Sequence, residues 1–168
     1  MTDRRLIGPE PLSSAHSVAG FTCGVGSLDS YLLRQALADQ RAEKSRTSVL
    51  SDCERVIAYW TLAAAAVEPA VATARLAAGQ GRQPVPVILL ARLAVDLAWQ
   101  GRGIGEAVLI EALARASHAA DLIGARAVLV HAVSDRAASF YARYGFEPSP
   151  TDPLHMVLLM KDIRASLK

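Results

Sequence analysis

Apolar residues change their spacing along the chain, and each spacing predicts one kind of element. Continuous or alternating apolar runs are typical of strands, whereas apolar residues three or four positions apart are typical of helices. The run from Val87 to Val95 predicts a buried strand, and Ile104, Val108 and Leu109 begin the apolar stripe of a helix. The pattern predicts strands at 5–12, 47–50, 56–67, 87–95, 127–133 and 156–160, helices at 27–42, within 69–79, from Ile104 and after Ser134, and a short basic tail at the end.

The order of these expected elements mixes strands and helices, which predicts an α/β fold. A length of 168 residues is typical of one domain, so we expect a single domain over 1–168. The hydrophobic share of 52% favours a buried core over disorder. Ser27 and Ser134 are candidate N-caps, and Gly145 is expected to stop the last of these helices.

Composition then excludes several classes of protein. No apolar run without a charge is long enough to cross a membrane, and the N-terminus lacks the apolar stretch of a signal peptide. Cys23 and Cys53 are too few and too far apart for a disulfide framework or a zinc site, so we expect reduced thiols in a cytoplasmic protein. The four histidines show no metal-ligand spacing, and no metal is expected.

The segment from Gln100 to Gly105 carries the strongest chemical signal. It places three glycines between the expected strand and the helix that follows. Backbone N–H groups in such a turn, together with the helix N-terminus, can bind a phosphate. A dinucleotide-binding fingerprint would need a third glycine where Glu106 stands, and no Gly-Lys-Ser/Thr of a P-loop occurs. The turn therefore predicts a cofactor with a pyrophosphate, of a kind that uses neither motif.

What does match is Gln-x-x-Gly-x-Gly at Gln100, Gly103 and Gly105, which resembles motif A of the GNAT acetyltransferases. A second segment, with Ala137, Phe140, Tyr141, Gly145 and Phe146, is similar to motif B of the same superfamily. The resemblance implies the GNAT acyl-CoA N-acyltransferase fold, an α/β (α+β) fold with a central, mixed, mostly antiparallel sheet flanked by helices. It implies acetyl-CoA as co-substrate, held by Leu93, Ala94, Val95, Gln100, Gly101, Arg102, Gly103, Ile104, Gly105, Ser134 and Ala138.

A narrower resemblance starts at Phe21. The stretch Phe21–Leu32 looks like the F-x-C-G-x-x-x-L-D-x-[WY]-L opening of the tRNA-acetylating toxins of bacterial toxin–antitoxin modules. Such a toxin moves acetyl to the α-amino group of an aminoacyl-tRNA and so blocks translation. The resemblance also implies a homodimer and a ribbon-helix-helix antitoxin, with operator DNA bound only through that antitoxin. Further matches follow in order at 44–47, 84–87, 91–96, Val130-His131-Ala132 and Phe140-Tyr141.

Residue roles follow from the same resemblance. Tyr141 takes the position that faces the cofactor sulfur and can protonate the leaving thiolate, whereas Phe140 and Phe146 are expected in the core. Between Arg34 and Arg92, eight basic residues stand against five acidic ones, although the whole chain carries only +2. An α-amino group is partly neutral near pH 7, and the sequence offers no convincing base. Candidate tRNA contacts are Lys44, Arg46, Arg75 and Arg92.

Two other functions fit these residues. One is a GNAT acetyltransferase acting on another primary amine, such as a protein N-terminus, a polyamine or a drug. A basic surface around the cleft would favour tRNA, whereas acidic residues inside the cleft would favour a small amine. The other is a non-catalytic CoA-binding partner module, against which Tyr141 and the intact glycine turn both argue.

Overall fold

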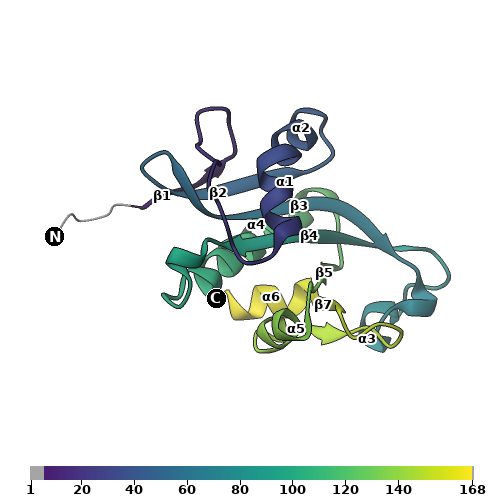
Figure 1. The fold of residues 1–168 in the computed structure, drawn as a ribbon. Coiled ribbons are helices and arrows are strands. Elements are labelled where there is room, and N and C mark those ends of the chain that lie inside the picture. Colours follow the sequence, from purple (N-terminus) through teal and green to yellow (C-terminus); the bar gives the residue numbers. More distant parts are fainter. Residues whose placement is uncertain (1–5, 168) are drawn as a thin grey trace. The chain divides into compact units, whose positions relative to one another are not determined.

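A computed structural model describes residues 6–167 (Figure 1). The chain forms two compact units, one of residues Met1–Ala63 with Arg92–Ala112 and one of Ala64–Ala91 with Leu113–Lys168. The boundaries between them fall inside two strands and one helix, so each of these three elements is divided between the two units. The expectation of a single domain over 1–168 stays a prediction.

Three antiparallel strands form the frame of the first unit. They are β1 (Leu6–Pro11), β2 (Arg46–Asp52) and the first part of β3 (Arg55–Val67), paired in the order β1-β2-β3. On β2, Thr47, Val49 and Ser51 are buried while their neighbours are more exposed, which is the alternation of a strand covered on one face. Both strands of the expected hairpin are confirmed, and both are longer than predicted.

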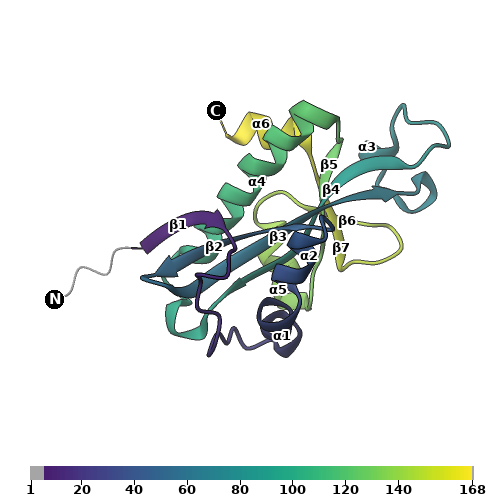
Figure 2. The same ribbon diagram turned by 90° about the horizontal axis from the view of Figure 1, so that it is seen from above.

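Helices α1 (Gly26–Arg34) and α2 (Ala36–Arg41) cover one face of β2 and β3 (Figures 1 and 2). The sequence had predicted one helix over 27–42. The prediction is wrong because the backbone at Gln35 leaves the helical region, with φ −124° and ψ −34°. Ser27 is not the N-cap of α1, because the N-cap residue is Val25. The backbone before the helix is held by a different hydrogen bond, in which the Cys23 N–H donates to the Asp29 carboxylate.

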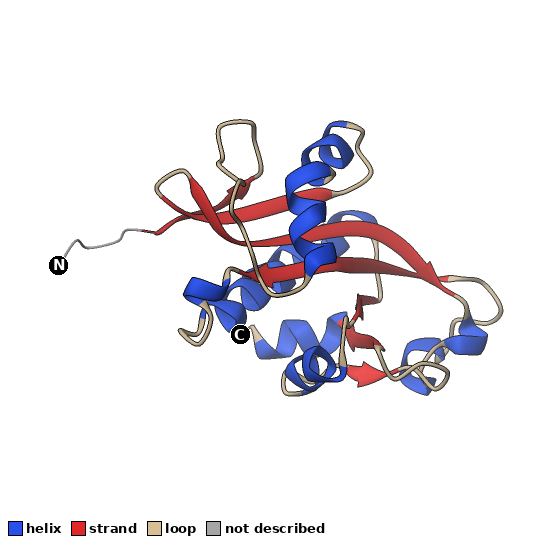
Figure 3. Cartoon of the chain, viewed as in Figure 1, coloured by secondary structure: helices blue, strands red, loops and turns tan. Residues whose placement is uncertain are grey.

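The second unit is built on a sheet with the strand order β4-β5-β7-β6. Its strands are β4 (Val85–Val95), of which the first part belongs here, β5 (Ala127–His131), β7 (His155–Leu159) and the short β6 (Glu147–Pro148). The β4–β5 pairing is parallel, whereas β5–β7 and β6–β7 are antiparallel. Parallel neighbours need a long crossover, which α4 (Ile104–Ile123) supplies along the chain (Figure 3).

The remaining helices confirm one expectation and correct two others. Ser134 caps α5 (Asp135–Ala142), because its hydroxyl oxygen accepts from the Ala137 N–H at 3.1 Å. The segment 69–79 holds two short helices, the 3₁₀ helix η1 (Pro69–Val71) and the α-helix α3 (Ala74–Ala77), where one was expected. The expected basic tail is a helix, α6 (Met160–Ser166), since Met160 and Ile163 on one of its faces are buried.

The fold class is confirmed as α/β with a mixed, mostly antiparallel sheet and flanking helices. Both cysteines are free thiols, Cys23 buried and Cys53 exposed. Among the helices of residues 6–167, none is long and apolar enough to span a membrane. Within the same range, no group of His, Cys, Asp or Glu side chains has the arrangement of a metal site.

Candidate active site

The glycine turn lies in the first unit, between β4 and α4. A short 3₁₀ turn, η2 (Leu97–Trp99), leads into it, and α4 begins at Ile104. Gly101 and Gly103 have φ angles of +76° and +80°, which favour glycine. No atom lies within 4 Å of the point where a Cβ would stand on either residue. Open space therefore lies beside both glycines, just before the N-terminus of α4, and such a space suits the pyrophosphate of acetyl-CoA.

The side chain of Gln100 holds this turn in place. Its Nε2 donates to the Val95 carbonyl at 2.8 Å and to the Cys23 carbonyl at 2.9 Å. The buried Asp96 carboxylate adds a second tie, accepting from the Ala98 N–H at 3.0 Å and the Thr22 N–H at 3.2 Å. The side chain of Gln100 is thus used inside the protein, and its backbone N–H donates to the Leu97 carbonyl at 3.4 Å.

We expect Gln100→Glu to destabilise the first unit. The substitution replaces a donor with a carboxylate that faces two carbonyl oxygens, so the free energy of unfolding should fall by about 2 kcal/mol. Urea unfolding of the variant measures this loss. Gln83→Glu, an exposed position with the same change of chemistry, is the matched control and should unfold like the wild type. Equal midpoints for all three proteins would mean that these two hydrogen bonds do not hold the turn.

Three of the four basic residues predicted to contact tRNA lie in the first unit. The Arg92 guanidinium carbon stands 3.4 Å from the centroid of the Tyr31 ring. The Tyr31 hydroxyl is in turn 3.2 Å from the Ser45 Oγ, between Lys44 and Arg46 in the sequence. The structure thus joins Arg92 to the 44–46 segment through one tyrosine, although 45 residues separate them in the sequence.

Asp39 lies beside this basic group. Its carboxylate accepts from the Tyr31 hydroxyl at 3.0 Å and from the Gln35 Nε2 at 2.8 Å. The pKa of Asp39 is lowered, first by the Gln35 hydrogen bond and further by that of Tyr31 and the positive charges of Lys44 and Arg92. This ionised carboxylate fixes the ring on which Arg92 rests.

Arg75 lies in the second unit and is engaged there by acidic side chains. Its guanidinium pairs with Glu147 at 3.0 Å and with Asp162 at 2.9 Å. The pKa of Arg75 is raised by these two hydrogen bonds. A phosphate would have to compete with two carboxylates for the Arg75 guanidinium, so Arg75 is less available for tRNA than the other three basic residues. Its contact with tRNA stays a prediction.

The second unit also carries α5 with Ser134, Ala138 and Tyr141. The Tyr141 ring lies 5.3 Å from the Phe140 ring and 5.4 Å from the Phe146 ring, and only 7% of the residue is exposed. Burial raises the pKa of Tyr141, so its hydroxyl keeps its proton at neutral pH. Phe146 is in the core as expected, whereas Phe140 is only half-buried, because it lies on the outer side of this aromatic group.

Within the described chain, the hydroxyl of Tyr141 makes no hydrogen bond to another residue. Ser51 is the only residue of that chain with a fully buried side-chain polar atom that lacks a partner, so the Tyr141 oxygen is not sealed in the interior. The Ser134 Oγ already accepts the capping hydrogen bond, which leaves its O–H available as a donor. Both groups can therefore donate to a bound molecule.

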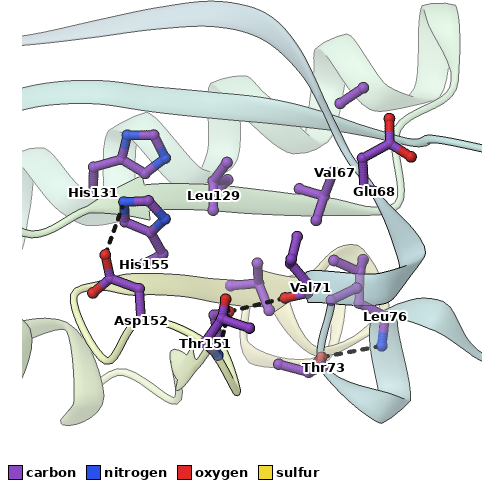
Figure 4. A pocket seen from close by; sticks show the side chains of 14 residues that line it. Val67, Glu68, Val71, Thr73, Leu76, Leu129, His131, Thr151, Asp152 and His155 are labelled. Atoms are coloured by element: carbon purple, nitrogen blue, oxygen red, sulfur yellow. Dashed lines mark hydrogen bonds and ion pairs between the residues drawn. The ribbon is translucent and has the colours of Figure 1, made fainter.

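The second unit contains a pocket of about 520 Å³ that the sequence did not predict (Figure 4). Two of its lining side chains, His131 on β5 and His155 on β7, stack with ring centroids 4.1 Å apart. The Asp152 carboxylate lies 3.5 Å from the His155 Nε2. The signal was present in Val130-His131-Ala132, a matched segment to which no role was given, but only strand pairing brings His155 opposite His131.

Comparisons with known proteins agree with the fold. The acetyltransferase (GNAT) domain family matches residues 43–148, a range that includes the glycine turn and α5. The chain therefore belongs to the GNAT acetyltransferase family. Within that family it is 48% identical over 157 residues to the tRNA-acetylating toxin of Mycobacterium tuberculosis (strain ATCC 25618 / H37Rv), covering 94% of each chain. It thus belongs to the same group of GNAT enzymes as that toxin.

Solved structures confirm the fold. The chain matches AtaT complexed with acetyl-methionyl-tRNAfMet with a TM-score of 0.86 at 22% identity, over 98% of this chain and 99% of that one. It also matches a mutant AtaT toxin bound to the C-terminus of the antitoxin AtaR and acetyl-CoA, with a TM-score of 0.80 at 23% identity, over 96% of each chain. At these identities the likeness establishes the GNAT fold.

Proposed function

We propose that this enzyme is a toxin that transfers acetyl from acetyl-CoA to the α-amino group of an aminoacyl-tRNA and thereby stops translation. The observation that carries the proposal is the 48% identity, over 94% of both chains, to a tRNA-acetylating toxin. In an acetylated amine the nitrogen lone pair is delocalised into the acetyl carbonyl, so the nitrogen no longer attacks the growing peptide. The modified tRNA therefore cannot donate its amino acid.

The glycine turn supports the way acetyl-CoA would be held. The turn that follows Gln100, up to Gly105, and the N-terminus of α4 are suited to the pyrophosphate, because open space lies beside Gly101 and Gly103. Leu93 and Ala94 are near the end of β4, where backbone groups can pair with the pantetheine arm like an added strand. When bound, acetyl-CoA supplies the thioester to be attacked. Arg102, Ile104, Ser134 and Ala138 complete the predicted contacts.

Tyr141 is the proposed acid. Its raised pKa keeps the hydroxyl protonated, and that proton can pass to the sulfur as the carbon–sulfur bond breaks. The neighbouring rings of Phe140 and Phe146 restrict the position of the phenol. A backbone N–H at the end of β4 can stabilise the negative charge that develops on the thioester oxygen.

Lys44, Arg46 and Arg92 are the proposed contacts to tRNA phosphates. Each phosphate contact releases counterions, so binding should weaken as salt rises. In the triple variant Lys44→Ala, Arg46→Ala and Arg92→Ala, we expect the slope of log affinity against log salt to fall by about three. Titration of charged tRNA at several salt concentrations measures this slope.

The matched control removes three exposed charges elsewhere, at Arg82, Arg115 and Lys161. It makes the same change in net charge, and its slope should stay near that of the wild type. If both triple variants lose slope equally, then net charge rather than a defined path governs tRNA binding, and the assignment of the three residues is wrong.

The function itself is tested by incubating the protein with total charged tRNA and labelled acetyl-CoA, and then identifying the labelled molecules. Label on the α-amino group of aminoacyl-tRNA is expected. A second candidate, acetylation of another primary amine, is favoured by the carboxylates of Glu68 and Asp152 at the pocket, which could attract a small cation. Parallel reactions with a polyamine and with peptide N-termini decide between the two, since label only there would overturn the tRNA proposal.

The proposed setting rests on the resemblance of the sequence to the tRNA-acetylating toxins. We infer a homodimer in the cytoplasm, where tRNA is charged, held inactive by a ribbon-helix-helix antitoxin through which operator DNA is bound. A relative of the same fold is described as bound to the C-terminus of its antitoxin, which supports a toxin–antitoxin pair for this chain as well. Co-expression with the product of a neighbouring gene, followed by mass measurement of the complex, tests this setting.

A further inference from the structure

The pocket of the second unit has a chemistry that matches one end of an aminoacyl-tRNA. Its floor is apolar, formed by side chains that include Leu76, Leu129 and Val157. Carboxylates stand at its two ends, Asp152 beside the histidines and Glu68 at the other end (Figure 4). A volume of about 520 Å³ is in the range of small-molecule sites. An α-ammonium group beside an apolar side chain would find an opposite charge and an apolar surface there.

The imidazole of His131 is the group at this pocket that is best placed to take a proton. It is the last residue of β5, it lines the pocket, and it stacks on His155 with an interplanar angle of 20°. The pKa of His131 is lowered, first by partial desolvation of its ring and second by electrostatic repulsion from His155, while the Asp152 carboxylate acts in the opposite direction. His131 is therefore neutral at pH 7, and a nitrogen lone pair is available.

We propose that this pocket receives the aminoacyl end of the tRNA and that His131 is the base that removes a proton from its ammonium group, with His155 and Asp152 as positioning residues. The inference rests on the proposed function and deepens it by giving the amine a binding site and a base. His155 holds the imidazole plane by stacking, and Asp152 in turn anchors His155.

The step balances as follows. One proton passes from the ammonium nitrogen to His131 and then to water. The freed lone pair forms the nitrogen–carbon bond to the acetyl group, and the carbon–sulfur bond breaks. The thiolate takes the Tyr141 proton, and the second amine proton replaces it on Tyr141. The products are the acetylated aminoacyl-tRNA, the free thiol of CoA and one proton released to water.

The pH dependence of the rate gives the sharpest test. The titratable groups at the pocket are His155 and Asp152, next to His131, and Glu68 at the other end. Because the pKa of His131 lies below 6.5, the wild-type rate should fall as pH drops through that lowered value. His155→Gln removes the electrostatic repulsion that lowers the pKa of His131, so this fall should move to higher pH. Asp152→Asn removes the opposing charge, so the fall should move to lower pH.

The experiment is single-turnover acetylation with saturating acetyl-CoA. Its substrate is a tRNA whose aminoacyl group is joined through an amide, which resists hydrolysis. At pH 6.5 we expect His131→Gln to lower the rate by on the order of 10²-fold. At pH 8.5 the amine is largely neutral by itself, and the loss should shrink to a few-fold. His118→Gln, an exposed histidine on α4, is the control and should match the wild type.

Chemical rescue separates a base from a structural side chain. His131→Ala should regain rate when imidazole is added to the buffer, in proportion to the neutral form of imidazole, because His131 is exposed to solvent. A wild-type pH profile for His131→Gln, or no rescue of a folded His131→Ala, overturns this inference while wild-type acetylation of tRNA still stands. If the wild type itself does not acetylate charged tRNA, it is the proposed function that fails.

Discussion

Tyr141→Phe should lower the rate of acetyl transfer to charged tRNA by on the order of 10²-fold. The substitution removes one hydroxyl and keeps the ring, so the contacts with Phe140 and Phe146 should persist. The proton is needed only as the carbon–sulfur bond breaks, so kcat should fall while KM for acetyl-CoA stays near its wild-type value. Single-turnover rates of the two proteins, both saturated with acetyl-CoA, measure the effect.

Tyr144→Phe provides the matched control for this result. Tyr144 follows α5 closely, and its ring lies 5.2 Å from the Phe140 ring, so it belongs to the same aromatic group without being the proposed acid. Its variant should acetylate at the wild-type rate. Equal rates for Tyr141→Phe and the wild type would mean that water protonates the thiolate, and Tyr141 would then lose its catalytic role.

Gly103→Val should weaken acetyl-CoA binding at least about tenfold, which corresponds to about 1.4 kcal/mol. A branched residue is strained at φ +80°, and its side chain would project into the space that we assign to the pyrophosphate. No protein atom lies within 4 Å of the new Cβ position, so a steric clash inside the protein does not explain a loss. Calorimetric titration with acetyl-CoA measures the affinity.

Gly20→Val separates backbone strain from the loss of a ligand contact. Gly20 has φ +79° and likewise no atom within 4 Å of its Cβ position, but it lies in a loop before α1. Both variants should lose similar stability in urea, and only Gly103→Val should lose affinity. If the folded Gly103→Val protein binds acetyl-CoA as tightly as the wild type, the pyrophosphate lies elsewhere.

Local pattern determined most of the elements of the fold. The turn from Gln100 to Gly105, the strand before it and the helix after it were predicted because their signals are short-range: an apolar run, three glycines and a helical stripe. The Ser134 cap was predicted for the same reason, since a cap involves residues only three positions apart. The family resemblance rests on these same local motifs.

The sequence was least informative where packing overrides propensity. The break at Gln35 divides a segment with a continuous helical pattern, and no glycine or proline marks it. The sequence predicts a tail where α6 forms, because most of its residues are charged or small and its apolar face is narrow. Met160 and Ile163 on that face are buried by tertiary contacts. Such elements owe their boundaries to what they pack against.

For the candidate site too, some features were predictable from the sequence and others depended on the tertiary structure. By itself, the sequence determined the fold class, the glycine turn, the position of Tyr141 and the basic residues. Only the tertiary structure decided which charges stay available, since it pairs Arg75 with Glu147 and Asp162 and stacks Arg92 on Tyr31. It also decided that His131 meets His155, because antiparallel strand register brings them opposite each other from distant parts of the chain. Spacing along a chain records neighbours within a few residues, whereas pairs of this kind exist only once the strands are aligned.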